Sequence, residues 1–202
     1  CVKFVNHKRW RMKPRPSGLG MNWCILLSNI LTDLINDAIL MRMKQTLMVK
    51  LAPTPEQHQA LLETMERFNE ACNYIANTAF ELRTASKFRL QKVVYRDTRE
   101  RFGLSAQLTI RAISKVSEAY KRDRSIKPTF KPHSAVVFDQ RILSWKGLDK
   151  VSILTLNGRQ IIPTRIGSYQ EARIDRKVRQ CDLILRDGAF YLAVVVDAPE
   201  PT

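Results

Sequence analysis

The stretch that decides the fold is KQTLMVKLAPTPEQ, residues 44–57. Its first eight residues alternate between apolar and mostly polar side chains, which is the period-two pattern of a half-buried strand. Ala52-Pro53 ends that strand. Thr54, Pro55 and Gln57 then supply an N-cap, a proline at the first helical position and the glutamine of a capping box. We therefore expect a strand that passes directly into a long helix.

The chain that follows has the pattern of three helical segments. Apolar residues recur every three or four positions from Leu61 to Leu82, which predicts an amphipathic helix of about seven turns. Residues 83–103 are polar and basic and predict a shorter helix, or a helix and a loop, packed on the first. A further helix begins after Ser105, its N-cap. Pro128 and Pro132 then force extended backbone around Phe130.

After residue 132 the apolar period changes from helical to two. The segments AVVFDQRILSW (135–145), KVSILTLNGRQIIPTRIG (150–167) and KVRQCDLILRDGAFYLAVVVDA (177–198) read as five or six antiparallel strands. Asn157-Gly158 and Asp187-Gly188 are hairpin signals. The early strand would otherwise lack a partner. We therefore expect an α+β fold: an antiparallel β-barrel (43–53 and 132–198) with a helical segment (54–131) inserted after its first strand.

The charge balance restricts the class of partner. The chain has 34 Lys and Arg against 19 Asp and Glu, a formal net charge of +15. So basic a protein usually binds a polyanion, most often nucleic acid and sometimes an anionic membrane face. The alternative is a surface that is basic for solubility alone.

Cysteine usage and the N-terminal stretch suggest the compartment. The four cysteines are scattered, with no pair at metal-ligand spacing. We therefore expect neither zinc nor disulfides, and we expect a cytoplasmic protein.

The N-terminal stretch contains basic residues followed by an apolar run, which superficially resembles a signal peptide. However, no small-residue cleavage site follows the run, and Asp33 and Asp37 make a membrane span unfavourable. Met43 is a better start than Cys1. We therefore treat residues 1–42 as an upstream extension that need not be native.

Enzyme chemistry has little support in the residues. No glycine-rich phosphate loop occurs among only seven glycines, and no histidine is spaced to act with a serine or cysteine. Asp197 stands at a strand end, where nucleases place a metal-binding carboxylate. However, Pro199 and Pro201 end pairing at once, and a two-metal site needs several carboxylates. We expect no catalytic residue in this chain.

Nucleic-acid binding has more support, because cations and aromatic residues occur together. Cations contact phosphates, and aromatic rings stack on unpaired bases. The first basic stretch consists of Lys121, Arg122, Arg124, Lys127 and Lys131, around Phe130; the second consists of Arg173, Arg176, Lys177 and Arg179. A solvated helix end with a core phenylalanine and a charged exposed loop are the alternatives. Four side chains could read base edges: Tyr95, Gln107, Arg111 and Gln140.

Four segments resemble a known family. They are LAPTPEQHQALLETMERFNEACNYIANTAFE (51–81), LSAQLTIRAISKVSEAYKR (104–122), KPTFKPHSAVVFDQR (127–141) and GAFYLAVVVDAPEP (188–201). The third is the most specific, with a Pro-x-Phe-Lys element followed by a Val-x-Phe-Asp strand. From Met43 onward the chain resembles the N-terminal part of TnpB, the OrfB protein of insertion-sequence transposons, related to compact type V CRISPR effectors.

The resemblance implies a wedge-type barrel with a helical recognition lobe, which binds guide RNA and double-stranded target DNA. In the family, DNA is cut by a RuvC-like nuclease domain that contains a zinc ribbon and begins a few residues after the last barrel strand. Residues 199–202 would start the linker to that domain. We therefore expect this chain to be catalytically incomplete, without a cofactor, membrane or small-molecule substrate of its own; magnesium and zinc would belong to the nuclease part.

The resemblance also implies roles for individual residues. The surface that reads a short motif beside the target would comprise Tyr95, Gln107, Arg111, Asp139 and Gln140. Phosphates would be held by Arg96, Arg99, Lys121, Arg122, Arg124, Lys127 and Lys131. In such complexes the guide reads the target sequence by base pairing, and the protein mainly recognises backbone and shape.

Two alternatives remain open. The chain could act alone as a binding-only regulator of transposition that blocks the full-length enzyme. It could also be an unrelated basic RNA-binding barrel, such as a ribosome-associated protein. That last alternative requires the helical segment not to interrupt the barrel.

Overall fold

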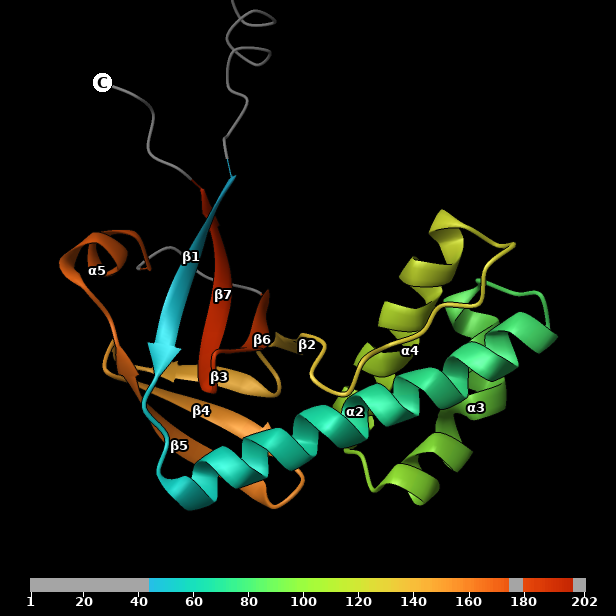
Figure 1. Cartoon of the computed structure of the whole chain (residues 1–202), viewed down its shortest axis with the longest axis horizontal. Coiled ribbons are helices and arrows are strands. Elements are labelled where there is room, and N and C mark those ends of the chain that lie inside the picture. The colour runs from blue at the N-terminus through green and yellow to red at the C-terminus, as the bar shows by residue number, and fades with distance from the viewer. Residues whose placement is uncertain (1–43, 175–179, 198–202) are drawn as a thin grey trace, which may run out of the picture. The chain divides into compact units, whose positions relative to one another are not determined.

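The computed structural model describes residues 44–174 and 180–197, and within these ranges the chain forms seven strands and four helices (Figure 1). The strands are β1 (Lys44–Leu51), β2 (Val136–Asp139), β3 (Leu143–Lys146), β4 (Lys150–Thr155), β5 (Gly158–Arg165), β6 (Gln180–Arg186) and β7 (Ala189–Asp197). The helices are α2 (Pro55–Glu81), α3 (Lys87–Phe102), α4 (Ala106–Arg122) and α5 (Ser168–Ile174). The expected α+β class is confirmed.

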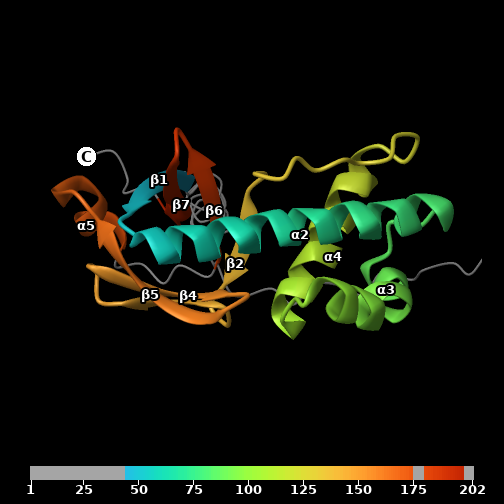
Figure 2. The same ribbon diagram turned by 60° about the horizontal axis from the view of Figure 1, so that its bottom comes forward.

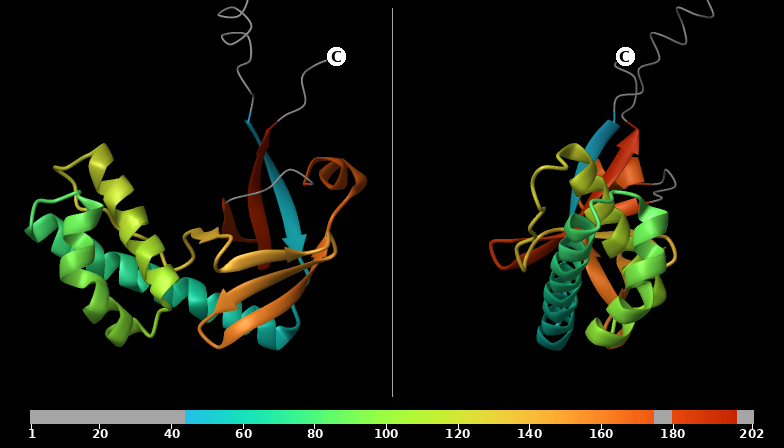
Figure 3. Two further views of the ribbon diagram at one scale, coloured as in Figure 1. Left: turned by 180° about the vertical axis from the view of Figure 1, so that it is seen from behind. Right: turned by 90° about the vertical axis from the view of Figure 1, so that its right-hand side faces the viewer.

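The seven strands form one antiparallel sheet that curls into a nearly closed barrel. Their order is β2-β6-β7-β1-β5-β4-β3, and β1 pairs with both β7 and β5. The two edge strands, β2 and β3, are consecutive in the chain and are separated only by residues 140–142. Helices α2, α3 and α4 therefore lie, in sequence, between strands of a single sheet (Figure 3).

The predicted capping box begins α2. The Thr54 hydroxyl accepts a hydrogen bond from the Gln57 amide at 3.3 Å, and the Gln57 carboxamide oxygen accepts one from the Thr54 amide at 3.1 Å. Gln57 also donates to the Ile161 carbonyl at 3.0 Å, so the first turn of α2 is attached to β5. From there α2 runs away from the strands to pack against α3 and α4 (Figure 2).

The other helix boundaries follow local signals. Ser105 caps α4 as predicted, because its hydroxyl accepts from the Leu108 amide at 3.3 Å. The 83–103 segment, for which a helix or a helix and a loop were both open, forms α3, and Gly103 ends it with φ +63°. None of the helices in the described ranges combines the length and hydropathy that a bilayer crossing requires.

The expectation of five or six strands after residue 132 is confirmed, since β2 to β7 are six strands. Residues 135–145 contain two of them, because a turn after Asp139 separates β2 from β3. In that turn, the Asp139 carbonyl accepts from the Ile142 amide at 3.0 Å, and its carboxylate accepts from the Arg141 amide at 3.0 Å. Helix α5 was not expected. The Asp187-Gly188 hairpin is confirmed, with both residues at positive φ (50° and 72°), as a type I′ turn requires.

Buried polar side chains of α2 hold the extended segment that leads into β2. Asn69 donates to the carbonyls of Pro132 and Ser134, each at 2.8 Å, and its oxygen accepts from the Lys115 ammonium at 2.9 Å. Asn73, one turn later, exchanges two hydrogen bonds with the backbone of Phe130. The prolines make this segment extended, and the asparagines fix where it lies.

The two cysteines within the described residues, Cys72 and Cys181, are free and buried in the core. Burial raises the pKa of each thiol to about 12. Both thiols are therefore protonated and unreactive near neutral pH.

The hydrogen bonds of Asn69 on α2 can be tested by their effect on stability. Asn69→Ala should lower the free energy of unfolding by about 2–4 kcal/mol, because two backbone carbonyls and the half-buried Lys115 ammonium each lose a partner. Urea denaturation followed by circular dichroism measures this change. Asn77→Ala, an exposed position two turns further along the helix, is the matched control and should change stability by less than about 0.5 kcal/mol. Equal losses in the two variants would contradict the role assigned to Asn69.

Candidate nucleic-acid interface

Asp139, at the end of β2, is the centre of the network that joins α4 to the sheet. Its Oδ2 accepts from Arg111 Nη2 at 2.6 Å and Arg111 Nε at 3.1 Å, and also from Gln107 Nε2. Its Oδ1 accepts from the Arg141 amide. The Asp139 side chain is 8% exposed and that of Arg111 is 24% exposed, so water screens this ion pair only partly.

The environment keeps Asp139 ionised. Burial by itself raises the pKa of this carboxyl, but the hydrogen bonds from Arg111, Arg141 and Gln107 and the charge of Arg111 lower it more. The net effect is a pKa below the usual value for aspartate. The carboxylate therefore carries its charge at neutral pH and fixes the Arg111 guanidinium between helix and strand.

The structure brings together three of the five residues predicted to read a target-adjacent motif. Gln107 and Arg111 lie one turn apart on α4, and both contact Asp139. Gln140 follows Asp139 in the turn and is exposed. Tyr95 is partly buried on α3, with the Arg99 guanidinium 5.8 Å from its ring centre, and within the described residues it makes no hydrogen bond to this group.

Sequence reasoning missed three side chains around this network. Arg141 is exposed in the same turn, and its guanidinium lies 3.5 Å from the Gln107 oxygen. Arg159 of β5 donates to the Arg141 carbonyl at 2.6 Å, and Arg111 Nη1 lies 3.4 Å from the Gln180 oxygen. Only Arg141 had a sequence signal, because it directly follows the Val-x-Phe-Asp-Gln motif. Arg159 and Gln180 come from distant strands.

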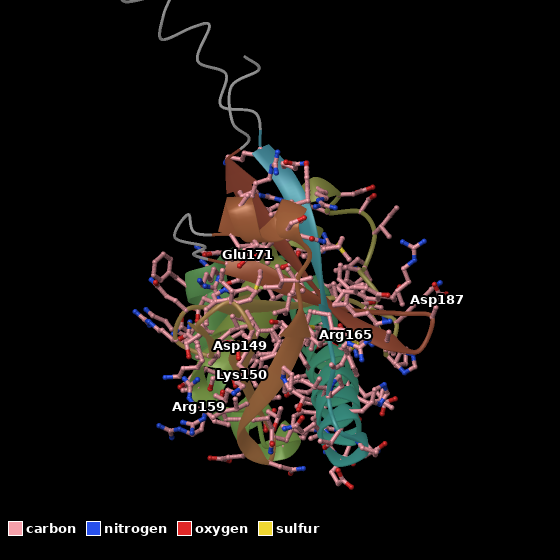
Figure 4. All side chains as sticks on the ribbon, turned by 90° about the vertical axis from the view of Figure 1, so that its left-hand side faces the viewer. Asp149, Lys150, Arg159, Arg165, Glu171 and Asp187 are labelled. Atoms are coloured by element: carbon pink, nitrogen blue, oxygen red, sulfur yellow. The ribbon has the colours of Figure 1, made fainter. Side chains whose placement is uncertain are left out.

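Arginine donors are therefore available on the surface where α4 meets the sheet. Asp139 uses the Nε and Nη2 edge of Arg111, so the more exposed Arg141 and Arg159 are the better placed to contact phosphates. Figure 4 shows Arg159, Lys150 and Arg165 spread along β4 and β5, with Asp187 far away on the other side of the view. We call Gln107, Arg111, Asp139, Gln140, Arg141 and Arg159 the junction cluster.

The predicted phosphate-holding residues lie mostly at the other end of α4. Lys121 and Arg122 occupy its last turn, and Arg124 and Lys127 follow in the connection; all four are exposed. Fourteen residues separate Gln107 from Lys121, which is about 20 Å along a helix. A duplex that contacts both the Asp139 network and the cations at the end of α4 must therefore extend over about two-thirds of one helical turn, which is 34–36 Å long.

Phe130 and Lys131 lie on the segment held by α2. Lys131 is exposed, whereas the Phe130 ring is partly buried with the Lys115 ammonium 5.0 Å from its centre. Base stacking on Phe130 stays a prediction. The adjoining groove is lined by Glu63, Glu66 and Glu70 of α2 together with Arg67, so its charge is net acidic and disfavours a polyanion. Arg96 and Arg99 are exposed on α3.

The second basic stretch is only partly within the described residues. Arg173 lies on α5, where its guanidinium carbon is 3.8 Å from the Tyr169 ring centre. Arg176, Lys177 and Arg179 lie outside the described residues. Asp197 ends β7 and pairs with Lys44 of β1. Across residues 44–174 and 180–197, no three His, Cys, Asp or Glu residues gather as a metal site would require.

The chain matches no protein-family model and no curated protein.

The Asp139 network predicts a pH-dependent stability. At pH 7, Asp139→Asn should lower the free energy of unfolding by about 2–4 kcal/mol, because it leaves the partly buried Arg111 charge without a counter-ion. The folded-state pKa of Asp139 is depressed, so its contribution is present above about pH 4 and is lost as the pH falls through the folded-state pKa. The difference between wild type and variant should therefore shrink in acid, as measured by urea denaturation at several pH values.

Asp149→Asn is the control for this experiment, because the Asp149 side chain is 72% exposed and pairs only with Lys150 at 3.7 Å. It should change stability little at any pH. A pH-independent loss in Asp139→Asn would show that the carboxylate charge is not what stabilises the junction.

Proposed function

We propose that this chain is the nucleic-acid-binding, N-terminal portion of a TnpB-like RNA-guided DNA endonuclease, which binds guide RNA and target DNA without cutting. In this proposal the barrel-like sheet is the wedge-type barrel, and α2, α3 and α4 form the recognition lobe. A cytoplasmic location follows from such a role.

The observation that carries the proposal is the contact among Gln107, Arg111 and Asp139. These residues were selected from the sequence because their counterparts would read a motif beside the target. They come from elements that are 28 or more residues apart, and they meet in one hydrogen-bonded group. Exposed arginines beside them supply the charge that phosphate binding needs.

The topology favours this proposal over an unrelated basic barrel. That alternative requires the helical segment not to interrupt the barrel. Strand β1 pairs with β7 and β5, both of which follow the helices in the chain. This pairing supports the proposed architecture, in which a helical segment interrupts the barrel.

Salt dependence tests the electrostatic part of the proposal. A guide-length RNA–DNA heteroduplex of arbitrary sequence should bind in a filter assay. If six phosphates are contacted, its affinity should fall on the order of 10³-fold between 50 and 200 mM salt, because binding releases condensed counter-ions. A flat response to salt would contradict the proposal.

Charge reversal at the junction cluster tests the location of the interface. Arg141→Glu should weaken heteroduplex binding at least about tenfold, because it removes a phosphate contact and adds a repulsive charge. Arg186→Glu makes the same charge change beside Asp187, on the side of the molecule away from Arg159 (Figure 4), and should weaken binding less than about threefold. Equal losses would mean that net charge alone drives binding and that the junction cluster is not the interface.

The absence of catalysis is also testable. Incubated with magnesium, the heteroduplex and supercoiled DNA, the purified chain should leave the DNA intact. The role proposed for it supplies binding but not the converging carboxylates of a two-metal nuclease. Cleavage that survives further purification would contradict this part of the proposal.

A further inference from the structure

The most exposed aromatic ring in the described residues is Phe88, the second residue of α3, which is 80% exposed. Its neighbours Lys87 and Arg89 are both basic. A ring exposed to this extent contributes little to the core, so packing among the described residues does not account for Phe88. Sequence analysis did not single out Phe88, because it lies in the segment where the helical pattern is weakest.

Four exposed cations continue from Phe88 along the same helix. Arg89, Lys92, Arg96 and Arg99 are spaced by three, four and three residues, so they lie on one face with neighbouring Cβ atoms about 5–6 Å apart. Leu90, Val94, Thr98 and Phe102 form the buried face of α3. We call Phe88, Arg89, Lys92, Arg96 and Arg99 the α3 ridge.

The charges of the ridge are not neutralised by ion pairs within the described part of the chain. None of its four cations is in a salt bridge there. The helix has only two acidic residues, Asp97 and Glu100, and Asp97 accepts a hydrogen bond from Tyr74 of α2. Six basic residues on α3 outnumber these two acids. The ridge therefore favours an anionic ligand extended along the helix.

Further basic and apolar side chains lie near the start of the ridge. The end of α2, the start of α3 and the end of α4 lie at the same end of the helices (Figures 1 and 3). The Ser117 hydroxyl of α4 donates to the Ala85 carbonyl at 2.6 Å, and the Phe80 and Tyr120 rings are 6.2 Å apart. The exposed Lys121 and Arg122 of α4 are thus close to the beginning of α3.

We propose that the α3 ridge binds an unpaired nucleic-acid strand, with phosphates on its four cations and one base stacked on the Phe88 ring. The ring presents a π-face that any base can cover, and the cations track the backbone beside it. A base paired inside a duplex cannot expose its face to Phe88, so the ligand must be single-stranded at this point. The inference rests on the proposed nucleic-acid binding and adds to it the kind of strand and its location.

An anionic membrane would use similar side chains, but the arrangement on α3 favours nucleic acid. The four cations form a line over ten residues of helix, about 15 Å long. The outward face also contains Glu100 and only one large aliphatic side chain, Val93. A helix that lies in a membrane needs a continuous apolar face, which α3 lacks on its exposed side.

Replacement of the ring by an aliphatic side chain separates stacking from hydrophobic contact. Phe88→Leu should bind oligothymidylate about 5- to 100-fold more weakly than wild type, because it removes the π-face. Phe88→Tyr, which keeps the ring, should bind within about threefold of wild type. A blunt-ended duplex of oligodeoxyadenylate and oligothymidylate serves as the paired comparison. The affinity of both variants for this duplex should change less than about twofold.

Leu82→Ala is the matched control, because Leu82 is apolar, 51% exposed and at the same end of the helices. Its affinity for oligothymidylate should stay within about twofold of wild type. Thermal unfolding of all variants should match that of wild type, since none of the replaced side chains is buried.

The possible outcomes distinguish this inference from the proposed function. If wild type and Phe88→Leu bind oligothymidylate equally well and with a steep dependence on salt, stacking is overturned and nucleic-acid binding stands. If wild type binds neither oligothymidylate nor any duplex at low salt, both ideas fail. If Phe88→Leu loses binding only to vesicles of phosphatidylserine and phosphatidylcholine, the ridge is a membrane contact and the inference is overturned.

Discussion

The rest of the structure depends on the partly buried charge pair between Asp139 and Arg111. Desolvation of a carboxylate is costly, and this one is tolerated because Arg111, Gln107 and the Arg141 amide satisfy its oxygens. The same carboxylate makes the turn that separates β2 from β3 and attaches α4 to β2. One side chain thereby brings the two edges of the sheet together and fixes a helix beside them.

A second polar network attaches the helices to the strands. Asn69 and Asn73 hold the proline-rich segment on α2, and Lys115 of α4 donates to both Asn69 and the Ala135 carbonyl. Burial lowers the pKa of Lys115. Hydrogen bonds are directional and fix a segment more precisely than apolar packing does. These polar side chains therefore fix the segment that leads into β2, the strand that ends at Asp139.

The distribution of charge separates surfaces of opposite character. Exposed cations lie along α3 and at the end of α4, and arginines lie near Asp139. The groove beside α2, by contrast, is net acidic. A polyanion would be attracted to the first surfaces and repelled from the last. Among the described residues the charge is thus unevenly placed, which supports the proposal that the basic surfaces bind nucleic acid.

The sequence by itself determined the local elements: the capping box at Thr54, the α4 cap at Ser105 and the Asp187-Gly188 hairpin. These depend on contacts between residues close in sequence, so short patterns suffice to predict them. Only the tertiary structure decided that residues 135–145 divide at Asp139, that Arg159 lies beside Arg141, and that Phe88 stays exposed. The turn at Asp139 is made by local hydrogen bonds, but the partners around it come from distant parts of the chain: Arg111 of α4 binds the Asp139 carboxylate, and Arg159 of β5 donates to the Arg141 carbonyl. No spacing rule along one strand can reveal those partners.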